Sequence, residues 1–340
     1  MATTTRFDRH PRARLVEERT PIQRLHRLEA ALGAVLNGSR LFVKRDDLAG
    51  FGGGSKVRKL DFLLGEARAA GADTIIATGL RQSNSARAAA AAAARLGLRV
   101  ELGLRPLTGD DAGEYLDGGN ALLDELYGAT VRDVSDAAQA AAFIAERRSA
   151  LGASAYVVPP GASSPVASLG YAEAALEIAD QEHELGLRFD RVVVPNGSSS
   201  TQAGLVAGFA LLGRRRRVQG FSVLAHAATA QATTLELARA AFALLDGEGE
   251  IAAGDVVVSD AFLGPGYGHT TPEAVEALRF LAAHEGLLLD PVYSAKAFAG
   301  LLALIRRGEL APRENVLFVM TGGAPSLFAY RDALSRASRP

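Results

Sequence analysis

The residue best placed to do chemistry in this sequence is a lysine that follows a glycine-rich segment. Lys56 comes just after residues 50–54, four of which are glycine, and it leads into an expected helix over residues 57–70. Glycine has no Cβ, so backbone and ligand can approach closely, and Lys56 could meet a carbonyl compound there. Taken alone, Lys56, Arg58 and Lys59 could equally form the solvated start of a basic helix. Cations at a helix N-terminus oppose the macrodipole, however, and this indicates an anion nearby.

A second chemical signal is the loop that follows an expected strand over residues 191–195. Residues 196–200 read Asn-Gly-Ser-Ser-Ser and precede an expected helix over residues 201–212. Backbone N–H groups, serine hydroxyls and the positive end of the helix dipole make such a loop a cup for a phosphate group. It is neither the Walker pattern nor the dinucleotide-binding glycine pattern. Taken alone, the serines could instead cap an ordinary helix.

Four further groups of polar or aromatic residues lie at the ends of expected strands or helices. Residues 82–85 read Gln-Ser-Asn-Ser, and Tyr293 precedes Ser294 at another helix start. Thr321 opens a Thr-Gly-Gly segment, and Tyr267 lies in a glycine-rich loop. Ordinary helix capping explains several of these residues one at a time. Together they are typical of ligand-binding loops, because open α/β sheets bind ligands at strand ends.

The elements that must position these loops alternate between strand and helix patterns. This alternation predicts an α/β fold with mostly parallel sheets, and 340 residues suffice for one large or two smaller domains. The expected strands and short apolar runs cover residues 41–44, 73–78, 98–104, 155–158, 191–195, 218–224 and 315–320. The expected helices cover residues 57–70, 83–96, 118–126, 136–151, 168–184, 201–212, 228–245, 272–285 and 294–307.

Composition excludes several other classes of function. Lys plus Arg (37) nearly balances Asp plus Glu (38), so there is no electrostatic reason to expect a nucleic acid or a membrane surface as partner. The absence of cysteine excludes disulfides and thiolate nucleophiles, and the six histidines lack metal-ligand spacing, so no metal site is expected. The polar N-terminal segment is not a secretory signal, and no apolar run is long enough for a membrane span. A cytoplasmic protein is expected.

Several segments, in consistent order from about residue 20 to residue 330, resemble the family of D-cysteine desulfhydrase and 1-aminocyclopropane-1-carboxylate (ACC) deaminase. This family belongs to the fold-type II pyridoxal 5′-phosphate enzymes related to the tryptophan synthase β subunit. The resemblance implies two parallel-sheet α/β domains with the cofactor in the cleft between them. The matching segments are residues 44–48, 53–60, 82–84, 197–205, 266–268, 290–293 and 321–325.

The resemblance also implies roles for individual residues. Lys56 would hold the cofactor as a Schiff base and shuttle the α-proton. Ser83 and Asn84 would face the substrate carboxylate and the cofactor's phenolic oxygen, beside Gln82 and Ser85. Tyr267 and Tyr293 would border the substrate as proton donors or shape determinants. The phosphate would be held by Gly197, Ser198, Ser199, Ser200 and Thr201, and the pyridine ring would be approached by Ser294 and Thr321.

Ser294 and Thr321 also distinguish between the activities known in this family. ACC deaminases carry glutamate and leucine at these positions, and a carboxylate keeps the ring nitrogen protonated better than a hydroxyl does. Elimination of a good β-leaving group needs a weaker electron sink, so desulfhydrase-like chemistry is favoured. Two other departures concern Ser55, where the family has asparagine, and Ser85, where it has histidine. A third is the phosphate loop, which usually reads Gly-Ser-Gly-Gly-Thr.

Arg81 stands where related chains tend to have an apolar residue. A guanidinium there could pair with a second anionic group on the substrate, such as a sulfonate or a carboxylate. Cysteate would be such a substrate. The alternative is that Arg81 is an ordinary surface arginine.

These observations predict a large domain of residues 1–53 and 161–340 and a small domain of residues 54–160. The predicted reaction is α,β-elimination on a small β-substituted amino acid, which gives pyruvate, ammonia and the leaving group. The alternatives are cysteate sulfo-lyase or ACC deaminase activity, β-replacement, and a sensor that binds pyridoxal phosphate without catalysis. The predicted partner is a small amino acid, and the family resemblance implies a homodimer. A nicotinamide dehydrogenase is opposed by the missing Gly-x-Gly-x-x-Gly pattern.

Overall fold

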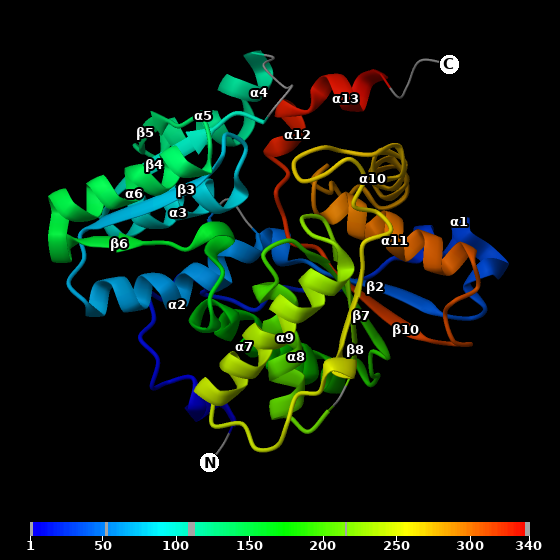
Figure 1. Ribbon diagram of the computed structural model, residues 1–340. Helices are drawn as coiled ribbons and strands as arrows, with labels where there is room; N and C mark the ends of the chain where they lie inside the picture. Colours follow the sequence, from blue (N-terminus) through cyan, green and yellow to red (C-terminus); the bar gives the residue numbers. More distant parts are fainter. Residues whose placement is uncertain (1–2, 52–53, 108–112, 215, 337–340) are drawn as a thin grey trace.

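The structure is a computed structural model that describes residues 3–51, 54–107, 113–214 and 216–336 (Figure 1). Gly52 and Gly53 of the glycine-rich segment therefore lie outside the described residues. The strands are β1 (Ile22–Arg24), β2 (Arg40–Lys44), β3 (Thr74–Leu80), β4 (Arg99–Arg105), β5 (Thr130–Asp133), β6 (Ala155–Val157), β7 (Arg191–Asn196), β8 (Arg217–Ser222), β9 (Val256–Ser259) and β10 (Asn315–Val319). The α-helices are α1 (His26–Leu32), α2 (Ser55–Ala69), α3 (Asn84–Leu96), α4 (Gly113–Asp117), α5 (Gly119–Leu126), α6 (Ala137–Leu151), α7 (Pro165–Leu185), α8 (Ser200–Leu211), α9 (Ala227–Leu244), α10 (Pro272–Glu285), α11 (Ser294–Arg306), α12 (Ser326–Ala329) and α13 (Arg331–Arg336).

The larger of the two sheets has six strands in the order β1-β2-β10-β7-β8-β9. β1 is antiparallel to β2, and every other neighbouring pair is parallel. A sheet covered by helices on both faces needs apolar residues at successive positions, because side chains alternate between the faces. On β7, Val192 and Val194 pack with α7, α8 and α9, whereas Val193 packs with α10 and α11. The sheet is thus the middle layer of three.

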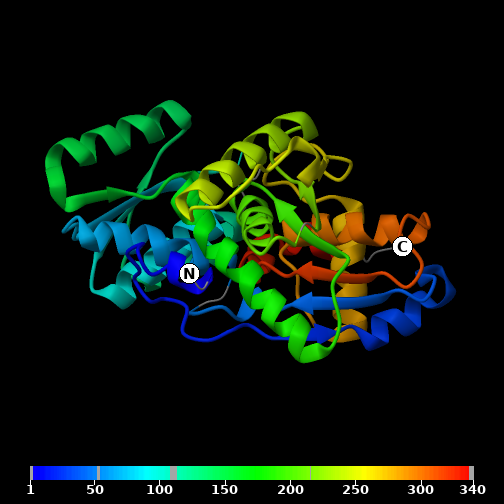
Figure 2. The ribbon, with the colours of Figure 1, turned by 90° about the horizontal axis from the view of Figure 1, so that it is seen from below.

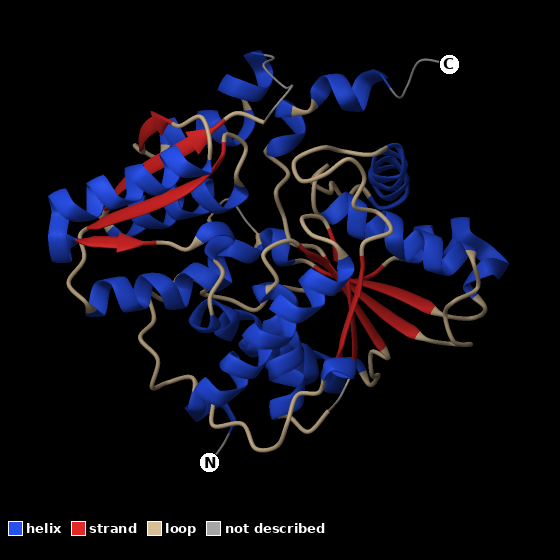
Figure 3. Ribbon diagram, viewed as in Figure 1, coloured by secondary structure: helices blue, strands red, loops and turns tan. Residues whose placement is uncertain are grey.

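The smaller sheet has four parallel strands in the order β5-β4-β3-β6. Ile75 packs against α2 and α3 on one face, and Ile76 packs against Phe143 of α6 on the other. The alanine-rich α3 is buried along most of its length, because its small side chains let it approach the sheet closely. Figure 3 shows the two groups of strands, and Figure 2 shows the two lobes side by side. The prediction of an α/β fold with mostly parallel sheets is confirmed.

Three short strands and several short helices were not among the elements expected from the sequence. All four residues of β5 are exposed, so this edge strand lacks the apolar alternation that marks a half-buried strand. β1 has only three residues. The helix α12 lies against α4 and α5, so the C-terminal segment returns from the large sheet to the small lobe (Figure 1). In the described part of the chain, no helix is both long and apolar enough to cross a membrane.

Helix α2, which carries Lys56, lies against α7 of the other lobe. Gly170 of α7 makes this approach possible, because a Cβ there would clash with the backbone oxygen of Arg58. The contact fixes where the first turn of α2 lies relative to the large sheet.

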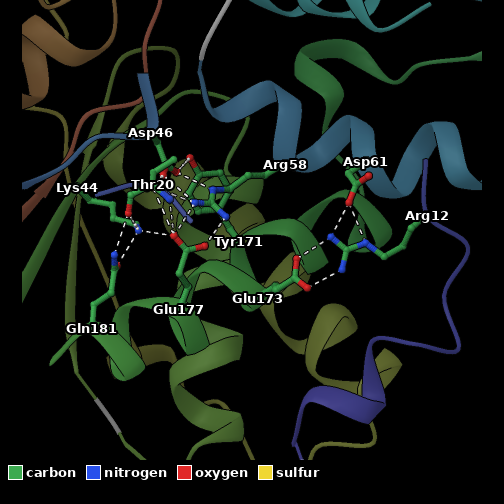
Figure 4. A network of polar contacts seen from close by, with 10 residues as sticks. All are labelled: Arg12, Thr20, Lys44, Asp46, Arg58, Asp61, Tyr171, Glu173, Glu177 and Gln181. Atoms are coloured by element: carbon green, nitrogen blue, oxygen red, sulfur yellow. Dashed lines mark hydrogen bonds and ion pairs between the residues drawn. The ribbon is translucent and has the colours of Figure 1, made fainter. Parts of the chain in front are cut away.

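A buried network of charges adds to this contact (Figure 4). The guanidinium of Arg58 donates Nε and Nη2 to the two oxygens of Asp46, each at 3.0 Å, and Nη1 to Glu177 at 2.9 Å. Lys44 pairs with the same Glu177. Burial alone would raise the pKa of Asp46, but Arg58 and Lys44 hold it below its ordinary value. The backbone oxygen of Asp46 also accepts the N–H of Gly54 at 3.0 Å, so the network is tied to the start of α2.

Candidate active site

An inner cavity lies where loops from both sheets meet. It brings together most of the residues singled out in the sequence. Asn84, the loop of residues 197–201 and Thr321 follow the carboxyl ends of β3, β7 and β10, where parallel sheets place ligands. The predicted residues on its wall are Lys56, Asn84, Gly197, Ser198, Ser199, Thr201, Tyr293 and Thr321, and they are joined there by Lys59, Arg87, Asp290, Gly322 and Gly323.

Lys56 lies in the first turn of α2, with its amine directed into the cavity. Gly54 caps this helix at φ +107°, and the next residue donates its N–H to Thr321 O at 2.9 Å. The Lys56 Nζ donates to Gly161 O at 3.1 Å. Burial lowers the pKa of Lys56 to about 8, although contacts with Lys59 and Asp290 oppose the shift. At neutral pH a useful fraction of the amine is therefore unprotonated, as attack on a carbonyl carbon requires.

Lys59 is a second amine in the same cavity, and the sequence analysis did not assign it a role. It follows Lys56 by three residues, which places both side chains on one face of α2. Its side chain is only 1% exposed, and burial followed by the neighbouring charge of Lys56 lowers its pKa well below the ordinary value. Among the described residues, no carboxylate forms an ion pair with Lys56 or Lys59. Two buried amines that form no ion pair, with Asp290 acting on Lys56 only through space, make this cavity suited to an anion.

The loop after β7 faces these amines from the large sheet. Ser199 caps α8 in the left-handed region at φ +67°, and the first N–H groups of a helix have no intrahelical acceptor. Ser198, Ser199 and Thr201 line the cavity. Ser200 does not line it, but its Oγ is buried and has no hydrogen-bond partner in the described part of the chain. This loop and Lys59 bring hydroxyl, backbone N–H and amine groups to one cavity, an arrangement that suits an anion.

The opposite part of the wall carries a buried carboxylate. Asp290 accepts the N–H groups of Tyr293 and Ser294 at 2.7 and 2.8 Å, and the Ser294 hydroxyl donates to its Oδ2. Burial raises the pKa of Asp290, and these hydrogen bonds oppose that shift. Asp290 lines the cavity, whereas Ser294 lies behind it. The sequence analysis assigned only the hydroxyl of Ser294 to this part of the site. The structure adds the carboxylate of Asp290, which is hydrogen-bonded to that hydroxyl.

An outer cavity opens from the inner one past Lys56, Gly197, Ser198 and Tyr293, which line both. Ser83, Ser85 and Tyr267 lie on its wall. The hydroxyls of Tyr267 and Tyr293 are hydrogen-bonded to each other, and their rings meet edge to face at 5.9 Å between centroids. Burial raises the pKa of both tyrosines. Both hydroxyls therefore stay protonated at neutral pH and can donate a proton or a hydrogen bond.

Two residues of the expected substrate site lie on neither cavity wall. The side-chain amide of Gln82 is used inside the protein, where it donates to Tyr115 O and Gly118 O and accepts the N–H of Asn120. Arg81 points away and pairs with Asp133 at 2.9 Å. The guanidinium that does line the outer cavity belongs to Arg105, the last residue of β4.

Comparisons with known proteins agree with this geometry. The family model described as "Pyridoxal-phosphate dependent enzyme" matches residues 13–322. The chain is 39% identical over 334 residues to 1-aminocyclopropane-1-carboxylate deaminase of Methylobacterium sp. (strain 4-46), covering 96% of this chain and 97% of that protein. It is also 39% identical over 330 residues to D-cysteine desulfhydrase of Klebsiella pneumoniae (strain 342), covering 96% and 98%.

Solved structures show the same arrangement of elements. The crystal structure of an ACC deaminase homologue superimposes with a TM-score of 0.87 at 35% identity and covers 98% of both chains. The crystal structure of a T.th. threonine deaminase, at 21% identity, shares the fold with a TM-score of 0.66 and covers 95% of this chain and 96% of that one. The two-lobed α/β fold is that of the fold-type II pyridoxal-phosphate enzymes. The match over residues 13–322 and the near full-length relatives show that this chain belongs to the pyridoxal-phosphate dependent enzyme family.

Proposed function

We propose that this chain is a lyase that carries out α,β-elimination on a small β-substituted amino acid and releases pyruvate, ammonia and the β-substituent. The observation that carries the proposal is the position of Lys56. Its partly neutral amine lines both the inner cavity, which also holds Lys59 and the serine loop, and the outer cavity. The names of the relatives, D-cysteine desulfhydrase and ACC deaminase, support a deaminating reaction on a small amino acid.

Pyridoxal phosphate fits the inner cavity by the chemistry of the groups on its wall. The loop residues Gly197–Thr201 and the amine of Lys59 would hold the phosphate, and Lys56 would bind the aldehyde carbon covalently. Asn84 would face the phenolic oxygen, and Ser294 with Asp290 would lie toward the ring nitrogen, beside Thr321. When bound, the cofactor withdraws electrons from the α-carbon of the amino acid.

The protein's own groups would then do three things. The first turn of α3, with Ser83, Asn84 and Ser85, would bind the substrate carboxylate through its hydroxyl and N–H donors. Lys56 would take the α-proton once the substrate amine has displaced it. Tyr267 and Tyr293 would donate a proton or a hydrogen bond to the departing group, because both stay protonated at neutral pH.

ACC deamination is a second candidate, and one observation favours it. Ser294 replaces the glutamate of the ACC deaminases, but the carboxylate of Asp290 is hydrogen-bonded to this hydroxyl. A buried carboxylate at this place would favour a protonated ring nitrogen. The product separates the two reactions, since ACC gives 2-oxobutyrate and a β-substituted alanine gives pyruvate.

The lowered pKa of Lys56 predicts how the cofactor-free protein takes up pyridoxal phosphate. Only the neutral amine attacks an aldehyde, so the rate of uptake should rise with pH and level off above about pH 8. An ordinary lysine would give a rate that keeps rising toward about pH 10.4. Stopped-flow absorbance between pH 6 and 10 measures this, with free N-acetyl-lysine as the reference. A profile that does not level off near pH 8 would contradict the assignment of the lowered pKa.

Replacing Lys59 with methionine should weaken cofactor binding by about 10- to 100-fold, because a charged hydrogen bond to the phosphate is lost. Binding of pyridoxal, which has no phosphate, should change much less. Fluorescence titration of the cofactor-free protein with both compounds measures the ratio, and Lys59→Arg serves as the charge-preserving control. Equal losses for the two compounds would place the phosphate elsewhere.

The function is tested by keto-acid release from purified holoenzyme. The panel contains D- and L-cysteine, D- and L-cysteate, the two enantiomers of β-chloroalanine, and ACC, with a Lys56→Ala protein as control. Pyruvate from a β-substituted substrate that is absent with the variant would support the lyase. Keto acid from none of these compounds, despite a Lys56-dependent cofactor spectrum, would contradict it and favour β-replacement or a sensor without catalysis.

We also propose the division of the chain into a large domain of residues 1–53 and 161–340 and a small domain of residues 54–160. The four strands of the small sheet, all within residues 74–157, support this division. We also propose, from the family resemblance, that the protein is a homodimer in the cytoplasm.

A further inference from the structure

The outer cavity has a mostly apolar wall with one guanidinium in it. Helix α6 contributes Ala140 and Ile144, and Leu224 lies on the wall formed by the large lobe. Among the described residues, Arg105 is the charged residue on this wall apart from Lys56. It ends β4 at the carboxyl edge of the small sheet, so it shares the cavity with the amine proposed to react with the substrate.

Arg105 is partly buried and has no fixed partner among the described residues. No hydrogen bond and no ion pair joins its guanidinium to any other described side chain or backbone oxygen. Asp136, whose pKa is lowered most by the N–H of Gln139 and least by Arg105, is engaged as the N-cap of α6. Tyr267 also lies within electrostatic reach of Arg105.

Arg81, which lies next to Arg105 in the small lobe, differs from it because its guanidinium has fixed partners. Arg81 donates Nη1 to Asp133 and Nε to Leu116 O, so its guanidinium is already satisfied outside the cavity. Leu80 and Arg105 are register partners in the parallel pair β3–β4, and both line the outer cavity. Arg81 comes directly after the end of β3, in a turn, and its ion pair with Asp133 holds its guanidinium outside the cavity. One arginine therefore lines the cavity and the other does not.

A guanidinium beside apolar groups that forms no ion pair with any described residue is suited to bind an anion in a bidentate manner. The α-carboxylate of an amino acid already has donors in the first turn of α3. We propose that Arg105 binds a second anionic group, carried on the β-carbon, so that the preferred substrates are β-sulfonate or β-phosphate amino acids. This inference rests on the proposed elimination and names its substrate class.

The reaction on the sulfonate, cysteate, is balanced without any oxidant or reductant. Lys56 accepts the α-proton, the Cβ–S bond breaks, and its electron pair leaves with sulfite. The aminoacrylate that remains takes up a proton at Cβ, and water adds to its imine form, which gives pyruvate and ammonia. For O-phosphoserine the Cβ–O bond breaks instead, and inorganic phosphate leaves. Arg105 would stabilise the negative charge on either leaving group.

The test compares anionic and neutral β-substituents in the wild-type holoenzyme and in Arg105→Ala. The kcat/KM for pyruvate release is measured on cysteate, O-phosphoserine and β-chloroalanine, each in both configurations. We expect Arg105→Ala to lower kcat/KM for an anionic substrate about 10- to 100-fold more than for β-chloroalanine. Arg105→Lys should recover part of the loss. Arg81→Ala and Arg99→Ala, which alter arginines paired with Asp133 and Asp73, should leave the ratio unchanged.

Binding gives a readout that does not depend on turnover. The wild-type holoenzyme should bind 3-sulfopropanoate, which has no amine and cannot react, and Arg105→Ala should bind it at least about 10-fold more weakly in calorimetry. Equal losses on neutral and anionic substrates would show that Arg105 holds the α-carboxylate and would overturn the proposal. If β-chloroalanine were a substrate but Arg105→Ala did not change the preference for anionic over neutral β-substituents, the proposal for Arg105 would be overturned. The proposed lyase function would remain. Failure of every substrate would reject the lyase, and the calorimetry would still decide the anion site.

Discussion

Replacing Lys56 with alanine is expected to abolish keto-acid release and to remove the covalently bound cofactor. The amine of Lys56 is the group that would bind the cofactor's aldehyde and then take the α-proton, and a positioned general base alone contributes about 10² to 10⁴ in rate. We therefore expect a loss of about 10³-fold or more in kcat. The measurement combines the substrate panel with the visible spectrum of the protein.

Lys59 is an alternative attachment point for the cofactor, because it lines the same cavity and lies on the same face of α2 as Lys56. Borohydride reduction of the holoenzyme followed by peptide mass spectrometry identifies which lysine carries the cofactor. Lys59→Met, at saturating cofactor, should keep a reducible adduct at Lys56. If the Lys56→Ala protein still formed a reducible adduct and released pyruvate, the covalent role would belong to another lysine.

Replacing Asp46 with asparagine is expected to destabilise the protein by about 3–5 kcal/mol. Asp46 is 0% exposed and accepts hydrogen bonds from Arg58, Thr20 and Tyr171. Removing one charge of a buried pair leaves the other uncompensated, which costs far more than losing a surface pair. In this network two positive groups, Arg58 and Lys44, would then share the single carboxylate of Glu177. Denaturant unfolding of both proteins at one pH measures the difference.

The neighbouring Asp47 offers a matched control. It pairs with Arg45 nearer the surface, with 16% of its side chain exposed, so Asp47→Asn should cost no more than about 1 kcal/mol. Because the Asp46 network holds α2 against α7, the Asp46 variant should also bind pyridoxal phosphate more weakly. If both substitutions cost the same, the buried network does not hold the two lobes together.

The same network explains the charged motif of residues 44–47, for which the sequence analysis offered only a family resemblance. In residues 44–47, Lys44 and Asp46 point into the buried network, and Arg45 and Asp47 pair with each other toward solvent. Lys44 is the last residue of β2, and Asp46 and Asp47 lie in the 3-10 helix that follows it. The sequence identified the cluster, but burial decided which charges were costly and therefore needed partners.

The local part of the site was readable from the sequence alone. Lys56 after its glycines, the serine loop at the start of α8, and the starts of α3 and α11 depend on residues close together in the chain. Their chemistry follows from helix N-termini and glycine conformations, which are local properties. The helix predicted over residues 272–285 has the same bounds as α10 for the same reason, since Pro272 and Gly286 mark its two ends.

What only the tertiary structure decided is which charged side chains share a cavity. Arg81 and Arg105 look alike in the sequence, yet Arg105 at the end of β4 lines the outer cavity, whereas Arg81, after the end of β3, is paired with Asp133. Lys59 and Asp290 became site residues because packing from both lobes buries them beside Lys56. The physical reason is that burial, pairing and facing direction depend on partners far away in the chain, which no local pattern specifies.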